Sequence, residues 1–360
     1  MVGARALSSF MIGFALFGTS FQASAQSPRW ADVDERAAAL EDRVIAWRRD
    51  IHANPELSNR EFRTAALVAE HLRSLGLDEV RTDIAHTGVV GVLMGGLPGP
   101  VVALRADMDA LPVVEQTGLD FASVVRTTYN GQEVGVMHAC GHDTHVAMLM
   151  GAAEVLAGMR ERIPGTVTFI FQPAEEGPPE GEEGGASLMV AEGALDNPRP
   201  DAIFGLHIGA RDPGVLFFTE GPMLASADVL KISVFGRQTH GAAPHRGIDP
   251  IVVSSQIILG LQTIHSRQID THETAVISIG SIHGGVRHNI IPGRVELVGT
   301  VRTHKSEVRR DIHERIARTA KGIAESAGAM AEVSWGHGVP VAYNEPDLVR
   351  TMLPTLERVA

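Results

Sequence analysis

Apolar residues recur along the chain with two different periods, and each period predicts a different kind of element. Leu40, Val44, Trp47 and Ile51 are spaced three or four residues apart, which places them on one face of an α-helix. The polar stretch NPELSN interrupts this pattern, and a second helical pattern then runs up to Gly76. We therefore expect two helices before the first strand.

Further along, several short runs are apolar at nearly every position. They read VVGVLMG, PVVALRAD, TVTFIFQP and DAIFGLHI. Such runs are typical of strands that are buried on both faces of a sheet. A helical stretch, HVAMLMGAAEVLAGMRERI, lies between two of them and ends before Pro164. This alternation of strands and helices predicts an α/β layered domain with a mostly parallel sheet.

The pattern changes at about Ala227, where strands and helices follow one another in the order βαββαβ. That order predicts a compact two-layer, ferredoxin-like domain inserted into the first one. We expect the layered domain over residues 26–226, the inserted domain over 227–337, and a return to the layered domain over 338–360.

Residues 1–25 have the form of a secretory signal. Arg5 is followed by an apolar stretch and then by the small residues Ala23, Ser24 and Ala25. The apolar part is too short and too interrupted for a membrane span. We expect cleavage after Ala25 and a secreted or periplasmic protein with no membrane association; the alternative is an uncleaved anchor.

Composition narrows the range of partners. The chain has 360 residues, of which 44% are hydrophobic, and a formal net charge of −12. This acidic balance argues against nucleic acid and against a membrane surface as a partner. Cys140 is the only cysteine, so it has no partner for an intramolecular disulfide in an oxidising compartment. It is either buried and inert or committed to a ligand such as a metal ion.

Chemically active side chains follow three of the predicted strands. Asp107 and Asp109 end one run, Glu175 and Glu176 follow another, and His207 follows a third. Open parallel sheets bind ligands beyond the carboxyl ends of their strands, so these ends can converge on one crevice together with the loop HACGHDTH. Carboxylates, imidazoles and a thiolate gathered in this way predict a transition-metal site.

Each of these residues also has a structural interpretation. His138 or His145 alone is more often a hydrogen-bonded structural histidine, and Asp143 can cap the helix that follows it. Glu175 and Glu176 can form a solvated turn. The coincidence of so many such residues at strand ends favours the metal site.

These stretches resemble a known family. The sequence is similar to the aminoacylase/carboxypeptidase superfamily of metal-dependent amidohydrolases, and most of all to hippurate hydrolases and indole-acetyl-amino-acid hydrolases. The matching stretches, which follow the family's order, are RRDIHANPELSNREFRTA, ALRADMDALPVVEQTG, MHACGHDTH, FQPAEEG, GLHIG, GRQTHGAAPHRGIDPI and RHNIIPGRVELVGTVRT. The resemblance implies a zinc-peptidase-type catalytic domain with an inserted dimerisation (lid) domain.

The resemblance also implies roles for residues. The implied metal ligands are Cys140, His142, Glu176 and His207. They would hold a divalent metal, two ions per subunit in the complete family fold, drawn from zinc, manganese, cobalt and nickel. Glu175 matches the general base, which takes a proton from a metal-activated water.

Further residues follow from the same resemblance. Asp109 matches the aspartate that orients the site. His240 matches a histidine that reaches into a partner subunit's site and stabilises the oxyanion. Asn289 matches a substrate-binding residue, and Arg302 is a candidate for the substrate carboxylate, although a solvated strand position explains Arg302 equally well. The implied substrate is a small N-acyl amino acid, and the implied assembly is a homodimer.

The sequence departs from the family in one respect, and this departure leaves alternatives to an active amidohydrolase open. Relatives carry an acidic EDF-type motif and a final histidine ligand near their carboxyl end, and neither follows Val341 here. The alternatives to an active amidohydrolase are therefore an impaired or inactive shortened relative that binds metal or acylated amino acids, and an exported dipeptidase of the same superfamily. A zinc nucleobase deaminase is disfavoured because its P-C-x-x-C signature needs two cysteines.

Overall fold

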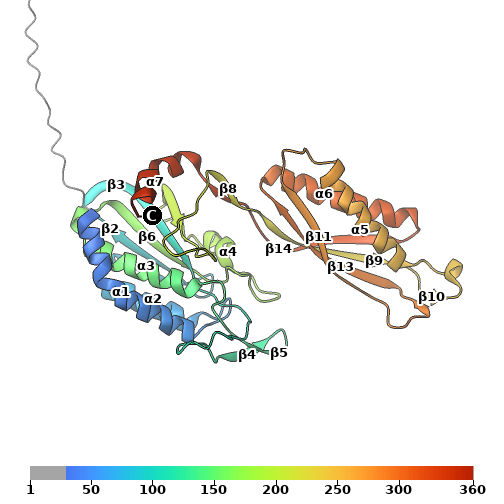
Figure 1. Ribbon diagram of the computed structural model, residues 1–360, viewed down its shortest axis with the longest axis horizontal. Coiled ribbons are helices and arrows are strands. Elements are labelled where there is room, and N and C mark those ends of the chain that lie inside the picture. Colours follow the sequence, from blue (N-terminus) through green and yellow to red (C-terminus); the bar gives the residue numbers. More distant parts are fainter. Residues whose placement is uncertain (1–29, 360) are drawn as a thin grey trace, which may run out of the picture. The chain divides into compact units, whose positions relative to one another are not determined.

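The computed structural model describes residues 30–359, except for the side chain of His337. The expected signal peptide, residues 1–25, lies outside the described residues. The chain forms two compact units, the first ending at Gly209 and the second beginning at Ala210 (Figure 1). None of the helices among the described residues is both long and apolar enough to cross a membrane.

The first unit is built on a five-stranded sheet. Its strands, in spatial order, are β1 (Glu79–Ile84), β2 (Gly88–Met94), β6 (Pro164–Gln172), β3 (Leu97–Asp107) and β7 (Ala202–Gly205). β3 runs parallel to both β6 and β7, whereas β2 is antiparallel to its neighbours β1 and β6. Four strands therefore point in one direction and only β2 is reversed, which confirms the mostly parallel sheet.

Helices cover both faces of this sheet and create two cores. The helices are α1 (Trp30–Ala53), α2 (Phe62–Ser74), α3 (His142–Ala157) and α4 (Gly185–Ala191). Phe169 and Phe171 of β6 pack with residues of α1, α2 and α3, whereas Ile170 packs with Met189 of α4 on the opposite face. Because alternate residues of a strand point to opposite faces, a strand covered on both sides needs apolar residues at successive positions.

Several short elements join these layers. They are the hairpin of β4 (Arg126–Tyr129) and β5 (Gln132–Gly135) and the 3₁₀ turn η1 (Arg160–Arg162). The hairpin comes between β3 and α3 in the chain, so the path from β3 to the HACGHDTH loop makes an excursion before it returns to the sheet.

The second unit contains the βαββαβ arrangement. Its elements in chain order are β9 (Ala227–Phe235), α5 (Pro250–Arg267), β11 (Ala275–Gly284), β13 (Arg294–Thr303), α6 (Ser306–Ser326) and β14 (Met330–Val339). The strands form an antiparallel sheet in the order β11-β13-β9-β14, and the apolar sides of α5 and α6 pack on it. The expected ferredoxin-like domain is therefore confirmed.

The remaining elements also belong to the second unit. They are β8 (Gly221–Leu224), β10 (Thr239–His240), η2 (Pro244–Arg246), β12 (Ile290–Ile291), β15 (Ala342–Asn344) and α7 (Pro346–Val359). β8 and β15 pair with each other, although they flank the inserted domain in the sequence. The expected bounds at 226/227 and 337/338 and the return of 338–360 to the first domain stay predictions.

A pair of leucines on α5 tests the packing of the second unit. Leu261 is fully buried in its core, whereas Leu259 on the same helix is 70% exposed. We expect Leu261→Ala to lower the free energy of unfolding by about 2–5 kcal/mol, because it removes buried methyl groups and leaves a cavity. Leu259→Ala is the matched control and should change it by less than about 0.5 kcal/mol. Urea unfolding followed by circular dichroism measures both, and equal losses would contradict this packing.

Candidate metal centre

The ends of three parallel strands place the predicted residues at one edge of the first sheet. Asp107, the last residue of β3, is aligned with Gln172, the last residue of β6. Glu175 and Glu176 follow β6 after a short connection, and His207 follows β7. α3 begins at His142, so the HACGHDTH loop ends at the same edge. The structure thus brings these residues together.

His142 presents one ring nitrogen to this edge. Its Nδ1–H donates a hydrogen bond of 2.7 Å to the backbone carbonyl of Asp109, so in the neutral ring the lone pair is on Nε2. This Nε2 is buried and has no hydrogen-bond partner. The oxygens nearest to it are Asp107 Oδ1 at 3.6 Å, Glu175 Oε2 at 3.8 Å and Glu176 Oε1 at 4.0 Å.

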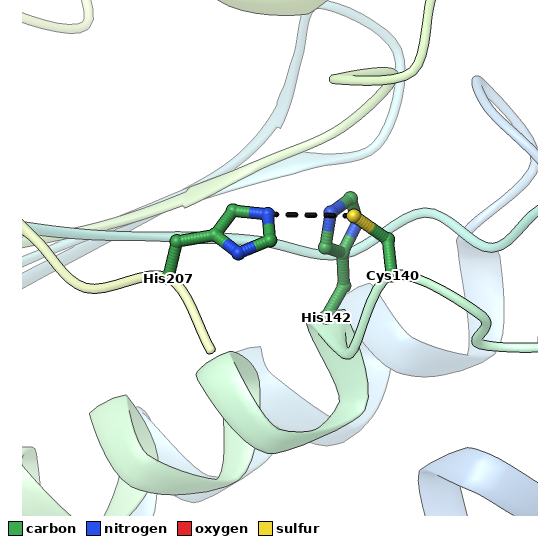
Figure 2. Close-up of side chains that lie close together, drawn as sticks. All are labelled: Cys140, His142 and His207. Carbon is green, nitrogen blue, oxygen red and sulfur yellow. Dashed lines mark hydrogen bonds between the residues drawn. The ribbon is translucent and has the colours of Figure 1, made fainter. Parts of the chain in front are cut away.

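His207 is oriented in the same way. Its Nδ1–H donates to the backbone carbonyl of Ile208 at 2.6 Å, and its Nε2 faces Cys140 Sγ at 3.3 Å (Figure 2). Metal-binding histidines characteristically donate one ring N–H to a carbonyl or carboxylate, which fixes the other nitrogen as the ligand. Both histidines meet this condition through backbone groups, which no side-chain substitution removes.

Two sets of potential ligand atoms share His142. One set joins Cys140, His142 and His207, and the other joins His142, Glu175 and Glu176; within each set the ligand atoms lie within 4.8 Å of one another. Nitrogen, thiolate and carboxylate ligands at these separations fit a divalent transition metal. The buried, unpartnered Nε2 of His142 lacks the partner that such an ion would provide.

A third set, formed by Asp107, His142 and His145, differs. The Nδ1–H of His145 donates to Asp107 at 2.6 Å, and its Nε2 accepts from the backbone N–H of Ile208 at 2.9 Å. Both ring nitrogens are therefore occupied, and His145 has the structural role expected of it. It holds the segment that carries His207.

Negative charge accumulates around these nitrogens. Burial opposes protonation of His142, but the neighbouring Asp109 carboxylate and Cys140 sulfur, together with the nearby charge of Asp107, raise the pKa of His142 to about 11. The hydrogen bond to Cys140 raises the pKa of His207 to about 9 despite its partial burial. The imidazoles of His142 and His207 in turn lower the pKa of the Cys140 thiol. A divalent cation would neutralise this charge in place of the protons.

Asp109 holds the turn that carries the two glutamates. Its Oδ1 accepts the backbone N–H of Glu175 and its Oδ2 accepts that of Glu176, both at 3.0 Å. Ser58 Oγ donates to the same Oδ2 at 2.7 Å. Burial would raise the pKa of Asp109, but these bonds and the bond with His142 hold it below its usual range. The carboxylate predicted to orient the site thus contacts both its histidine and its acidic turn.

The acidic turn spans Ala174 to Gly177. The backbone N–H of Gly177 donates to the carbonyl of Ala174 at 3.3 Å, which places Glu175 and Glu176 at the two central positions. The Glu175 side chain is 36% exposed. Burial and the negative charge of Asp107 raise the pKa of Glu175. Adjacent residues of one turn can therefore serve different purposes, one as a ligand and one as a base.

Gly141 allows the thiol and the imidazole to approach each other. Its φ is +93°, in the left-handed region that favours glycine. A Cβ at this position would lie 2.3 Å from Ile208 Cδ1. The HACGHDTH loop therefore packs its backbone directly against the segment that carries His207.

The other predicted residues belong to the second unit. His240 on β10 and Asn289 are neighbours, because β10 pairs with β12 and the N–H of Gly241 donates to the Asn289 carbonyl at 2.8 Å. Asn289 is half-buried, and its Oδ1 has no hydrogen-bond partner. Arg302 lies exposed on β13. The roles expected for these three residues stay predictions.

Comparisons with known proteins agree with this geometry. Residues 103–360 match the model of peptidase family M20/M25/M40. The chain is 43% identical over 323 residues to thermostable carboxypeptidase 2 of Saccharolobus solfataricus, covering 89% of this chain and 79% of that protein. It belongs to peptidase family M20/M25/M40. It is thus an enzyme acting on amide bonds, and the family resemblance read from its motifs is confirmed.

Two further members of the M20/M25/M40 family are informative. An N-acyl-L-amino acid amidohydrolase of Geobacillus stearothermophilus is 43% identical over 307 residues, which is 84% of this chain and 79% of that protein. The crystal structure of a dinuclear metal-binding M20 peptidase of Bacillus subtilis superposes with a TM-score of 0.73 at 38% identity. That match covers 89% of this chain and 81% of the Bacillus chain.

The structure differs from two of the structural interpretations that the sequence allowed, and it adds one residue that the sequence did not reveal. Asp143 does not cap α3 with its side chain; instead its Oδ2 accepts from Arg48 Nε at 2.7 Å and bonds His52 Nδ1 at 3.0 Å. His138 is buried, but neither ring nitrogen has a partner, unlike the hydrogen-bonded structural histidine expected there. Ser58 was missed because it lies in a polar loop with no periodic signal.

Substitution of the thiol tests the metal centre of this M20-family chain. Cys140→Ala removes one ligand from the set that also contains His142 and His207. Elemental analysis of the purified protein after dialysis should show at least one equivalent of divalent metal in the wild type and a clear loss in the variant. His86→Ala, which removes a surface imidazole of the same unit, should retain the metal. Equal metal content in Cys140→Ala and wild type would contradict the ligand assignment.

Proposed function

We propose that this protein is a metal-dependent amidohydrolase that removes the acyl group from N-acyl amino acids. The observation that carries the proposal is the shared orientation of His142 and His207, each with Nδ1–H bound to a backbone carbonyl and Nε2 turned toward thiol or carboxylate groups. The relative from Geobacillus stearothermophilus, an N-acyl-L-amino acid amidohydrolase, supports the substrate class.

Cys140, His142, Glu176 and His207 would hold divalent metal, and the dinuclear Bacillus subtilis relative supports two ions. When bound, such ions supply a Lewis acid for the amide carbonyl and lower the pKa of water. The protein's own contribution is to fix the ligands: backbone carbonyls orient both imidazoles, and the Asp109 carboxylate orients the turn with Glu176.

Glu175 would act as the general base. Its carboxylate lies at the site but is still partly exposed, so it can reach a water molecule without being a ligand itself. Its raised pKa brings its protonation closer to neutral pH, which suits a group that first accepts a proton and then passes it to the leaving amine.

His240 would stabilise the oxyanion in a partner subunit. Its Nδ1 accepts a hydrogen bond of 3.1 Å from the backbone N–H of Ala242, so a neutral ring carries its hydrogen on Nε2. The side chain is exposed, which leaves this Nε2–H available as a donor to developing negative charge. Asn289 beside it would contact the substrate, and Arg302 would bind the substrate carboxylate. This arrangement requires a homodimer.

A peptidase activity is the second candidate. The same groups that hydrolyse an acyl amide also hydrolyse a peptide bond, and the relative from Saccharolobus solfataricus is named a carboxypeptidase. Initial rates on hippurate, N-acetyl amino acids and dipeptides, with added zinc, manganese, cobalt or nickel, separate the two candidates. Higher kcat/KM on dipeptides than on every N-acyl amino acid would overturn the proposed substrate class.

We also propose export of the protein, with cleavage after Ala25.

The glutamate at position 175 tests the proposed chemistry. Glu175→Gln keeps the size of the side chain but removes the base, so kcat on the best N-acyl amino acid should fall by about 10²–10⁴-fold. Metal content should remain at the wild-type level, because Glu175 is not a proposed ligand. Glu180→Gln changes an exposed acid that follows the same turn and should leave kcat unchanged. A loss of less than tenfold in Glu175→Gln would contradict the role of base.

Mixing two variants tests whether His240 acts across subunits. His240→Ala and Glu175→Gln should each be nearly inactive with metal retained. If a dimer joins the His240 of one subunit to the Glu175 of the other, a mixed dimer contains one intact site and one inactive site, so co-expression should give mixed dimers with about half of the activity of a wild-type dimer. Activity no higher than that of either variant alone would argue against the shared site.

A further inference from the structure

Glu61 is a fully buried carboxyl group that the proposed chemistry does not use. It stands at the start of α2, but its side chain makes no capping hydrogen bond there. Glu56 does so instead, because its two carboxylate oxygens accept the backbone N–H groups of Arg63 and Thr64, both at 2.9 Å. The fold of α2 therefore does not explain why an acid is buried at position 61.

The carboxylate of Glu61 reaches across to the acidic turn. Its Oε1 accepts the backbone N–H of Ala174 at 2.8 Å, and its Oε2 accepts the hydroxyl of Thr87 at 2.6 Å. Ala174 immediately precedes Glu175 and has a φ of +49°, an unusual conformation for alanine that persists only when its surroundings hold it. Glu61 provides one such contact directly at that residue.

Three consecutive backbone N–H groups are held in this way. Ala174 donates to Glu61, and Glu175 and Glu176 donate to Asp109. Asp109 is itself bound by Ser58, which belongs to the same loop as Glu61. The loop of residues 56–61 thus secures the acidic turn once directly and once through Asp109.

Burial of this acid is unfavourable for the fold. Burial raises the pKa of Glu61 to about 7, although the hydrogen bonds from Thr87 and Ala174 act in the opposite direction. An apolar residue of similar size would avoid this desolvation but would leave the Ala174 N–H without an acceptor, and a glutamine would accept it only as a neutral group. The buried carboxylate of Glu61 is therefore better explained by its hydrogen bond with Ala174 than by packing.

We infer that Glu61 is a positioning residue, which binds the Ala174 amide and thereby fixes the direction in which Glu175 presents its carboxylate to the attacking water. This inference rests on the proposed role of Glu175 as the base. A displacement of a reacting group by about 1 Å can cost on the order of 100-fold in rate, so one hydrogen bond at the preceding residue is sufficient to matter.

Three variants separate positioning from stability. Glu61→Met removes both acceptors, Glu61→Gln retains a neutral acceptor for Ala174, and Thr87→Val removes the other hydrogen bond of Glu61 while it leaves the bond to Ala174. We expect kcat to fall by about 10–100-fold in Glu61→Met and by less in Glu61→Gln, with KM and metal content close to wild type. Thr87→Val should lower the melting temperature but retain kcat.

Hydrogen–deuterium exchange of metal-free protein at pH 8 gives a second measurement that does not depend on activity. The amide of Ala174 should exchange faster in Glu61→Gln than in wild type, because a neutral acceptor binds an N–H more weakly than a carboxylate does. Thr87→Val should leave this rate unchanged. The comparison remains valid if Glu61→Met does not fold, because the glutamine variant preserves the volume of the side chain.

The outcomes distinguish this inference from the proposed function. If the wild type hydrolyses no N-acyl amino acid, the proposed function fails, and the exchange of Ala174 still tests the hydrogen bond that positions the turn. If the wild type is active, then equal kcat in wild type and both Glu61 variants would overturn the inference. Unchanged exchange of Ala174 in Glu61→Gln, or an equal loss of kcat in Thr87→Val and Glu61→Met, would overturn it as well.

Discussion

The site depends on two hydrogen bonds that imidazole N–H groups donate to backbone carbonyls, from His142 to Asp109 and from His207 to Ile208. Each bond fixes the tautomer of its ring and turns Nε2 toward the carboxyl edge of the sheet. The acceptors are main-chain atoms of segments that follow β3 and β7, so the sheet itself determines the orientation of the ligands. Without these bonds the rings would be free to rotate, and the nitrogens would not converge.

The sheet edge carries more negative charge than the fold requires. Asp107, Asp109, Glu175 and Glu176 gather there with the thiol of Cys140, and Glu61 lies buried behind the turn. Like charges in a buried region destabilise one another, so the helices on both faces must offset this cost by packing. The same crowding favours a divalent cation. The negative charge at this edge therefore lowers the stability of the fold and at the same time favours metal binding.

The sequence was sufficient for features that follow from local pattern. Strand ends are visible as the points where apolar runs stop, which is why Glu175, Glu176 and His207 could be expected beside the HACGHDTH loop. The βαββαβ order of the second unit was likewise readable from alternating periods. The reversed direction of β2 was not readable, because periodicity gives no strand direction.

Contacts between distant parts of the chain could not be predicted. Glu61 and Ala174 are 113 positions apart, and Ser58 and Asp109 are 51 apart, so no spacing rule connects them. The same reason applies to Asp143. Its position at the start of a helix suggests a helix cap, but its carboxylate forms hydrogen bonds with Arg48 and His52 of α1 instead. Sequence patterns indicate which hydrogen bonds a side chain is able to form, whereas the tertiary fold determines which of these bonds it forms.

The contact between Gly141 and Ile208 limits which substitutions the thiol-bearing loop can accept. A Cβ at position 141 would overlap the isoleucine side chain, and the backbone there is already left-handed. The two positions therefore constrain each other sterically, although they lie far apart along the chain. A smaller residue at position 208 would remove only the overlap, and any side chain at position 141 would still have to adopt a left-handed backbone conformation.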